Sequence, residues 1–267
     1  MQIARHLRST ALMLLASVAA TTLASPARAD LVEEIVQRNE LRVAVQTQGP
    51  PVSFINADGK RTGFAVEVAR DLADKMGVEI KFLDYEWKGL IPALLSGKAD
   101  LIAADMTPTV KRSLRLSFTQ PVFYSSVVAF SKGDRFTAWQ DVNQQGVTVA
   151  VVQGSNHVGI AAERLPKAEI KEYSGGGPAV AQAVASGRAD AGINSRSSAS
   201  VFTREFEDLQ ILEGTVKKTP LSLAVRPQSA HLLHLIDNYI TFMKTSGELD
   251  GMVEYWWQTD RWEADRK

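Results

Sequence analysis

The sequence lacks cysteine altogether, and this absence removes several kinds of structure at once. A chain without cysteine forms no disulfide bond, has no thiolate ligand for zinc and offers no cysteine for lipid attachment. Its four histidines, His6, His157, His231 and His234, stand at no spacing that is typical of a metal site. We therefore expect neither a metal nor a cofactor, and a fold held together by a conventional hydrophobic core.

An excess of charge of one sign is missing as well. The 30 Lys and Arg side chains balance 30 Asp and Glu side chains, so the formal net charge is zero. Such a chain has no long-range attraction for nucleic acid or for an anionic membrane surface, and we expect neither as a partner.

Apolar runs long enough to span a membrane are also absent, and the longest run lies close to the N-terminus. Arg5 and Arg8 precede an apolar stretch over residues 11–23, which is shorter than the roughly 20 residues of a membrane helix. Ala27-Arg28-Ala29 then supplies the small-x-small pattern of a cleavage site. We predict that residues 1–29 are a cleaved signal peptide and that the mature chain is a monomer in a periplasm. An uncleaved N-terminal anchor is the alternative.

The rest of the sequence alternates two kinds of pattern. Short β-rich runs over residues 41–45, 78–82 and 99–104 alternate with helical spacing over residues 64–76 and 90–95. This alternation is typical of α/β units, in which mostly parallel sheets are flanked by helices.

A weak internal repeat indicates two similar lobes. The string LSGKAD at residues 95–100 is echoed by ASGRAD at residues 185–190, and the run at 41–46 is echoed at 147–153. Polar segments near residues 132–134 and 217–220 indicate that the chain crosses between the lobes twice, which predicts a two-strand hinge that permits closure. We assign residues 30–123 to the first lobe, 124–220 to a hinge strand and the second lobe, and 221–267 to a second hinge strand and a return to the first lobe.

Four loops are expected to form the ligand site, because open α/β sheets bind ligands beyond the carboxyl ends of their strands. They are residues 48–51, 105–109, 153–156 and 194–198, and they are rich in glycine, hydroxyl and amide groups. Thr107-Pro108-Thr109 predicts a helix start capped by Thr107, and Gly154-Ser155-Asn156 predicts a second start. The free N–H groups at such starts favour an anion.

Two longer side chains are candidates for the same site. Arg112 lies one turn into the first of these helices, where its guanidinium can pair with a carboxylate, although a solvated Arg beside Lys111 is the alternative. Trp87, just before another helix, can form an apolar wall of the site or pack in an ordinary way. The tryptophans near the end of the chain, at positions 256, 257 and 262, are interpreted as helix packing and not as ligand contacts.

Taken together, several motifs resemble the family 3 extracellular solute-binding proteins, the polar amino-acid receptors of ABC importers, along essentially the whole chain after residue 29. The motifs are Gly49-Pro50-Pro51-Val52-Ser53-Phe54, Asp58-Gly59-Lys60 with Thr62-Gly63-Phe64, the run from Trp87 to Leu95, Met106-Thr107-Pro108-Thr109 with Arg112, Phe118-Thr119-Gln120-Pro121, Gln153-Gly154-Ser155 and Ala189-Asp190-Ala191. The resemblance implies the type II periplasmic binding protein fold, with two lobes joined by a two-strand hinge.

The resemblance also implies roles for particular residues. Arg112 and Thr107 would hold the α-carboxylate of a ligand, Ser155 and Asn156 would donate to it from the other lobe, and Trp87 would flank the ligand's side chain. Members of the family bind without chemistry, so no catalytic residue is expected, and the implied protein partner is the permease of an ABC transporter.

The departures from the family pattern concern the ligand. The acid that typically receives the ligand's amino group is replaced by Ser195, while Asp105 stands where the family more often has Gly or Ser. Asp105 can supply the missing negative charge from the first lobe, or it can pair with Arg196 across the crevice. Arg196 can instead recognise a second anionic group. The expected ligand is therefore an unusual amino acid or a small organic acid.

Two other classes of function were weighed against a transport receptor. The family includes a dehydratase branch that acts on cyclohexadienyl carboxylates, and such chemistry needs an acid or base near the carboxylate. Asp105 is the one carboxyl in the four loops and has no second acid beside it. A sensory or lytic module is expected to carry a further domain, whereas this sequence runs only a few residues past its last predicted helix. We therefore favour a stand-alone receptor.

Overall fold

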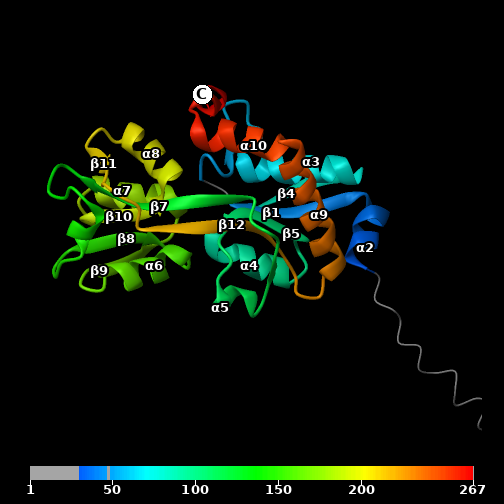
Figure 1. Ribbon diagram of the computed structural model, residues 1–267, viewed down its shortest axis with the longest axis horizontal. Coiled ribbons are helices and arrows are strands. Elements are labelled where there is room, and N and C mark those ends of the chain that lie inside the picture. Colours follow the sequence, from blue (N-terminus) through cyan, green and yellow to red (C-terminus); the bar gives the residue numbers. More distant parts are fainter. Residues whose placement is uncertain (1–29, 47–48, 267) are drawn as a thin grey trace, which may run out of the picture.

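Two lobes lie side by side and are joined by two long strands (Figure 1). The computed structural model describes residues 30–46 and 49–266. The predicted signal peptide, residues 1–29, and Gln48 of the first predicted loop lie outside the described residues.

The first lobe is built on three parallel strands. Strand β1 (Glu40–Gln46) lies between β4 (Glu79–Tyr85) and β5 (Leu101–Met106) and pairs with both of them. Helices cover the two faces, with α3 (Phe64–Met76) and α9 (Ala230–Ser246) on one side and α4 (Trp87–Leu95) on the other (Figure 1). The remaining elements of this lobe are α2 (Leu31–Arg38), β2 (Phe54–Ile55), β3 (Arg61–Thr62), α5 (Val110–Ser113), β6 (Ser117–Phe118), α10 (Glu248–Val253), the π-helical turn η3 (Glu254–Gln258) and η4 (Arg261–Arg266).

The second lobe repeats the plan. Strand β8 (Thr148–Val152) pairs in parallel with β9 (Glu169–Tyr173) and β10 (Ala191–Ser195). Helix α6 (Asn156–Arg164) lies on one face, while α7 (Gly176–Ala185) and α8 (Arg196–Glu205) lie on the other (Figure 1). The lobe is completed by η2 (Trp139–Val142) and β11 (Leu209–Ile211).

The strands that join the lobes are β7 (Phe123–Lys132) and β12 (Lys217–Val225), which pair antiparallel from Lys217–Val127 to Leu221–Phe123. Strand β12 continues into the first lobe beside β5, and β7 continues into the second lobe beside β10. A single curved sheet therefore runs through both lobes, in the order β4-β1-β5-β12-β7-β10-β8-β9.

The internal repeat corresponds to a repeated structural link between strands. In the first lobe Asp100 accepts a hydrogen bond from the backbone N–H of Arg42 at 3.0 Å, and its own N–H donates to the Arg42 carbonyl at 2.8 Å. In the second lobe Asp190 makes the same two bonds with Thr148, at 2.8 and 2.9 Å. Each aspartate thus fixes the start of one parallel strand against its neighbour.

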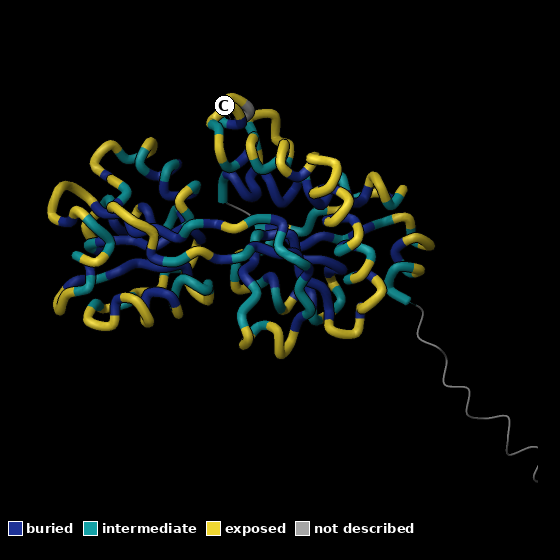
Figure 2. The backbone as a smooth tube through the Cα atoms, viewed as in Figure 1, coloured by how far each residue is buried: buried dark blue, intermediate teal, exposed yellow. Residues whose placement is uncertain are grey.

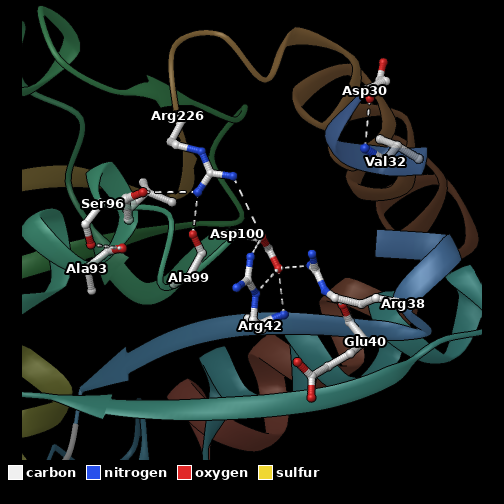
Figure 3. Close-up of polar contacts among 11 residues, drawn as sticks. Asp30, Val32, Arg38, Glu40, Arg42, Ala93, Ser96, Ala99, Asp100 and Arg226 are labelled. Atoms are coloured by element: carbon white, nitrogen blue, oxygen red, sulfur yellow. Dashed lines mark hydrogen bonds and ion pairs between the residues drawn. The ribbon is translucent and has the colours of Figure 1, made fainter. Parts of the chain in front are cut away.

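Asp100 is the more deeply buried of the two, and its side chain is 0% exposed. It forms ion pairs with Arg38, Arg42 and Arg226, and Arg226 also donates to the carbonyls of Leu94 and Ala99 (Figure 3). This cluster lies at the amino ends of β1 and β5, away from the ligand loops, and its role is structural.

The core follows the sheet. In both lobes the inner strands are buried beneath the helices, whereas the outer strands β4 and β9 are partly exposed, and other exposed residues gather on loops and on outer helix faces (Figure 2). Helix α3 begins and ends at the predicted residues, because Gly77 adopts the left-handed conformation (φ 69°) that terminates the helix.

The helix predicted to start at Thr107 is different. The prediction that Thr107 caps it is wrong: α5 is a single turn that begins at Val110, and the Thr109 hydroxyl accepts a hydrogen bond from the N–H of Arg112. The capping bond is made by the Thr109 hydroxyl instead, so the helix begins after Pro108 and Thr109.

Candidate functional site

A cavity lies between the two lobes and is lined from both of them. It encloses about 720 Å³ of empty space, part of it open to solvent. The first lobe contributes Gln46, Gly49, Pro50, Val52, Trp87, Ala104, Asp105, Thr107 and Trp257; the second contributes Val152, Ser155, Asn156, His157, Gly177, Pro178, Asn194, Ser195, Ser198 and Phe202; and the joining strands contribute Ser125, Val127, Thr219 and Leu221. Apolar walls carrying a few polar groups are typical of sites for small molecules.

The lobes touch across one side of this cavity. The indole Nε1 of Trp87 donates a hydrogen bond to the carbonyl oxygen of Gly154 at 3.2 Å, and Nη2 of Arg112 donates to the same oxygen at 3.3 Å. The guanidinium of Arg112 also lies over the Trp87 ring, 5.5 Å from its centroid. Two residues of the first lobe thus donate hydrogen bonds to one carbonyl oxygen of the second lobe.

Arg112 is a half-buried cation in the gap between the lobes. Nη1 donates to the Thr107 carbonyl at 2.8 Å, and no carboxylate among the described residues forms an ion pair with the guanidinium. Burial lowers the pKa of Arg112 to about 10, so the group keeps its charge at neutral pH. Its side chain borders a groove beside the cavity, and Thr107, Ser155 and Asn156 line both spaces. The junction can therefore hold an anion.

Helix starts from the second lobe face the same cavity. Ser155 caps α6 by accepting a hydrogen bond from the His157 N–H at 3.2 Å, and Ser195 caps α8 by accepting one from the Ser198 N–H at 3.3 Å. The predicted start at Gly154-Ser155-Asn156 is confirmed. The hydroxyl of Ser195 caps the helix and carries no charge, so Ser195 cannot play the part of an acid toward the ligand's amino group.

Asp105 occupies the cavity end of β5 in an unusual conformation. Its φ of 51° is left-handed, and its Oδ2 atom is buried without a hydrogen-bond partner. Burial raises the pKa of Asp105 to about 7. A carboxyl in this state can accept a hydrogen bond from a bound molecule or form an ion pair with a positively charged group on it.

His157 faces the cavity from the second lobe and was not among the predicted site residues. Its Nδ1 atom is buried without a partner, and burial together with the nearby charge of Arg112 lowers the pKa of His157 to about 4. The imidazole is therefore neutral at pH 7. The sequence feature that could have indicated His157 as a site residue is its position directly after the predicted helix start at Ser155-Asn156.

Comparison with protein-family models identifies the family of this chain. Residues 41–259 match the model of the bacterial extracellular solute-binding proteins, family 3. The chain belongs to this family.

Relatives of this solute-binding protein are named for the amino acids that they bind. It is 28% identical over 260 residues to the L-cystine-binding protein TcyJ of Escherichia coli K12, covering 96% of this chain and 97% of the relative. It is 24% identical over 222 residues to ABC transporter arginine-binding protein 1 of the same organism, covering 81% of this chain and 90% of the relative.

Solved structures agree with the family and the fold. The ancestral amino acid-binding protein AncCDT-1, described as a precursor of cyclohexadienyl dehydratase, superimposes with a TM-score of 0.78 at 32% identity, over 85% of this chain and 99% of the other. The arginine-bound form of truncated ArgBP from T. maritima gives a TM-score of 0.72 at 30% identity, over 79% of this chain and 99% of the other. The solute-binding protein shares the two-lobe fold of these amino-acid-binding neighbours.

Arg196 of the solute-binding protein lies outside the cavity. Its side chain is exposed, donates to the Gly214 carbonyl at 3.2 Å and lines a separate groove beside α8. The ion pair between Asp105 and Arg196, one of the alternatives, is not formed among the described residues, and Arg196 is not placed to contact a molecule in the cavity.

The tryptophans near the C-terminus divide into two groups. Trp256 and Trp262 pack in the core of the solute-binding protein, at 5% and 3% exposure, as predicted. Trp257 also packs, against Phe64 and Phe123, and in addition it lines the cavity, which the sequence analysis had not predicted. The pattern of apolar residues could not separate Trp256 from Trp257, because they are adjacent and their directions depend on the local helix geometry.

In the part of the solute-binding protein that the structure describes, no three His, Asp or Glu side chains gather where they could hold a metal ion. Within residues 30–46 and 49–266, no helix has the length and apolar character needed to cross a membrane.

Proposed function

We propose that this protein captures an amino acid, or a related small carboxylate, between its two lobes in a periplasm and delivers it to the permease of an ABC transporter. The observation that carries the proposal is the cavity between the lobes, bordered by a half-buried arginine that no described carboxylate neutralises. An uncompensated charge in such a place is costly, and a ligand carboxylate would compensate it.

The carboxylate would lie at the junction of the cavity and the groove of Arg112. There Thr107 contributes from the first lobe, while Ser155 and Asn156 contribute the start of α6. Backbone N–H groups at the start of a helix favour an anion. Trp87 would cover the ligand from the side, since its indole already contacts Gly154 of the other lobe.

Asp105 would receive the amino group of the ligand. It would take the role of the acid that is usual in the family at the position of Ser195. Among the described residues that line the cavity, Asp105 is the one with a carboxyl group. A ligand with one carboxylate and one ammonium group would therefore pair its carboxylate with Arg112 at the edge of the cavity and its ammonium group with the buried carboxyl of Asp105.

Substitution of Arg112 tests the proposed function. We expect Arg112→Ala to weaken binding of the best ligand from an amino-acid and organic-acid panel by about 2–5 kcal/mol, because it leaves a desolvated anion unpaired. Isothermal titration gives the affinity, and thermal unfolding checks the fold. Arg115→Ala is the matched control, since Arg115 borders the same groove but is exposed. Equal effects of the two substitutions would refute the assignment.

A second function is favoured by one observation. Asp105 is a buried carboxyl with a pKa raised to about 7, the state that a general acid requires, and a structural neighbour is described as a precursor of a dehydratase. We rank an enzyme second because the relatives of known function are named as binding proteins. Turnover of prephenate or arogenate by the purified protein, abolished in Asp105→Asn, would reverse this ranking.

A further inference from the structure

Unpartnered polar atoms gather at the cavity. Among the described residues, five buried side-chain nitrogen or oxygen atoms have no hydrogen-bond partner, and they belong to Asp105, Ser131, His157, Ser222 and Trp257. Three of these residues, Asp105, His157 and Trp257, line the cavity. Buried polar groups are nearly always bonded in folded proteins, so atoms left without a partner around a cavity mark the places where a bound molecule completes the bonding.

Trp257 is directed to the cavity by a change of helix type. Residues 254–258 form a π-helical turn between α10 and the end of the chain. Such turns are rare and recur at functional sites, because the wider turn changes the direction of the side chains that follow. Here Trp256 packs into the core against Phe54 and Trp262, while the next residue, Trp257, faces the ligand space.

The indole of Trp257 is held firmly by its neighbours. It stacks on Phe123 with ring centroids 4.8 Å apart and an interplanar angle of 21°, and Phe64 meets it edge-on at 5.6 Å. The ring orientation is therefore set before any ligand enters. An indole N–H can only donate a hydrogen bond, so its partner must be an acceptor.

Trp257 lies at the opposite end of the cavity from Arg112. The end that meets the groove of Arg112 is shared by Thr107, Ser155 and Asn156. Trp257 and Ser125, in contrast, also line the groove beside α8 and the C-terminal segment. Figure 1 shows α8 and this segment on one side of the β7–β12 ribbon, and α5 and α6 on the other. A ligand with its carboxylate near Arg112 would point its far end toward Trp257.

The charges of the cavity limit what that far end can be. Among the described residues that line the cavity, Asp105 is the one acid, and the amino group of the ligand would use it. Asp260 lines only the groove beyond Trp257, so a second positive charge buried within the cavity at this end would meet an N–H donor and no carboxylate of the cavity lining, which makes its burial costly.

We infer that Trp257 is a specificity-determining residue whose Nε1–H donates to an uncharged hydrogen-bond acceptor at the end of the ligand away from its carboxylate. The ligand class is then amino acids with a neutral, acceptor-bearing side chain, in preference to arginine or lysine. This inference rests on the proposed binding function and goes beyond it by naming the side chain that is recognised.

Isosteric ligand pairs test the inference. L-asparagine is compared with L-leucine, and L-glutamine with L-homoleucine, by isothermal titration, with L-arginine and L-lysine in the same series. We expect the better amide to bind about tenfold more tightly than its isostere, and Trp257→Phe to remove that difference while changing the isostere by less than about twofold. Trp139→Phe is the matched control, because Trp139 packs against the core of the second lobe, away from the cavity.

Several outcomes would overturn the inference. Preference of the wild type for arginine or lysine would do so, and so would an amide affinity that Trp257→Phe leaves unchanged. If binding depends on Arg112 but not on Trp257, the proposed function stands and this inference falls. If no amino acid in the series binds the wild type, this inference falls, and the proposed function is decided by the wider panel of amino acids and organic acids.

An NMR measurement on the wild type keeps the test independent of the stability of the variant. With ¹⁵N-labelled indoles, the five tryptophans give separate Nε1–H signals, which sequential assignment identifies. Addition of the better amide should move the Trp257 signal downfield, as expected for a new hydrogen bond, and leave the Trp139 signal in place. A Trp257 signal that does not move at saturation would overturn the inference.

Discussion

Asp105 combines two features that each cost stability. Its backbone is in the left-handed region at φ 51°, where residues other than glycine are uncommon, and its carboxyl is buried without a partner for Oδ2. Local strain and an unpaired polar atom together indicate a position maintained for a ligand and not for the fold. Asn or Gly at this position should therefore stabilise the empty protein.

The stability of the ligand-free closed form should depend on pH through Asp105. Its pKa is raised from 3.8 to about 7, so the folded protein holds a proton that the unfolded chain releases. The corresponding stability is fully present below about pH 4 and is lost as the pH rises to about 7, by an amount on the order of 4 kcal/mol. Urea unfolding at pH 5 and pH 8 should show the part of this loss that falls above pH 5, about 3 kcal/mol, in the wild type and not in Asp105→Asn.

Ligand binding should carry the opposite dependence. An ammonium group pairs with the ionised carboxyl, so binding below pH 7 releases the proton of Asp105 and weakens about tenfold for each pH unit below that value. Titrations in buffers of different ionisation enthalpy measure the released proton. Affinity that falls as the pH rises would mean that the ligand has no cation, as expected for an organic acid.

Individual site residues could be predicted where a motif fixes them to a strand end. Thr107, Ser155 and Asn156 were predicted from such motifs, and all three line the cavity. Trp257 was not predicted, because its direction is set by a π-helical turn that leaves no mark in the apolar pattern. His157 was missed because a single histidine in a helix start is ambiguous until its burial is known.

At the scale of elements, the repeated aspartates are a device for joining parallel strands. Asp100 binds the N–H of Arg42 and Asp190 binds the N–H of Thr148, so that each lobe uses one carboxylate where its two innermost parallel strands begin. The two sites differ in burial: the Asp100 side chain is 0% exposed, whereas that of Asp190 is 30% exposed.

This difference predicts unequal effects of the same substitution. Asp100→Asn should lower the free energy of unfolding by about 3 kcal/mol, because Arg38 and Arg42 lose a buried partner. Asp190→Asn should cost about 1 kcal/mol or less, because its ion pair with Arg135 is exposed to solvent. Urea unfolding of both variants measures the comparison, and equal losses would contradict it.

Long, strongly patterned elements could be predicted closely from the sequence, whereas short ones could not. Helix α3 spans the predicted residues, because apolar spacing and a terminating glycine act together over thirteen residues. Helix α5 has only four residues, too few for any periodicity, and its start depends on which of two nearby threonines, Thr107 or Thr109, caps it. Local competition of this kind is decided by backbone geometry, not by composition.

At the scale of the whole molecule, contacts join the lobes on both sides of the β7–β12 ribbon. On one side Trp87 and Arg112 donate to Gly154. On the other side Arg204 of α8 forms an ion pair with Glu263 of η4, which belongs to the segment packed on the first lobe. Contacts that exist only when the lobes are together shift the equilibrium toward closure and so favour ligand binding.

Removal of the ion pair on the second side should therefore weaken binding without touching the cavity. The Arg204 and Glu263 side chains are 49% and 28% exposed, so the pair is worth about 0.2–1 kcal/mol. Glu263→Gln should raise the dissociation constant of the best ligand by up to about fivefold, and the difference from the wild type should shrink in high salt. Glu248→Gln is the control, because Glu248 pairs with Lys75 inside the first lobe and this contact does not change when the lobes separate. Small-angle scattering of the ligand-free variants supplies a second measurement: Glu263→Gln should have the larger radius of gyration, and a radius equal to that of Glu248→Gln would show that the pair does not hold the lobes together.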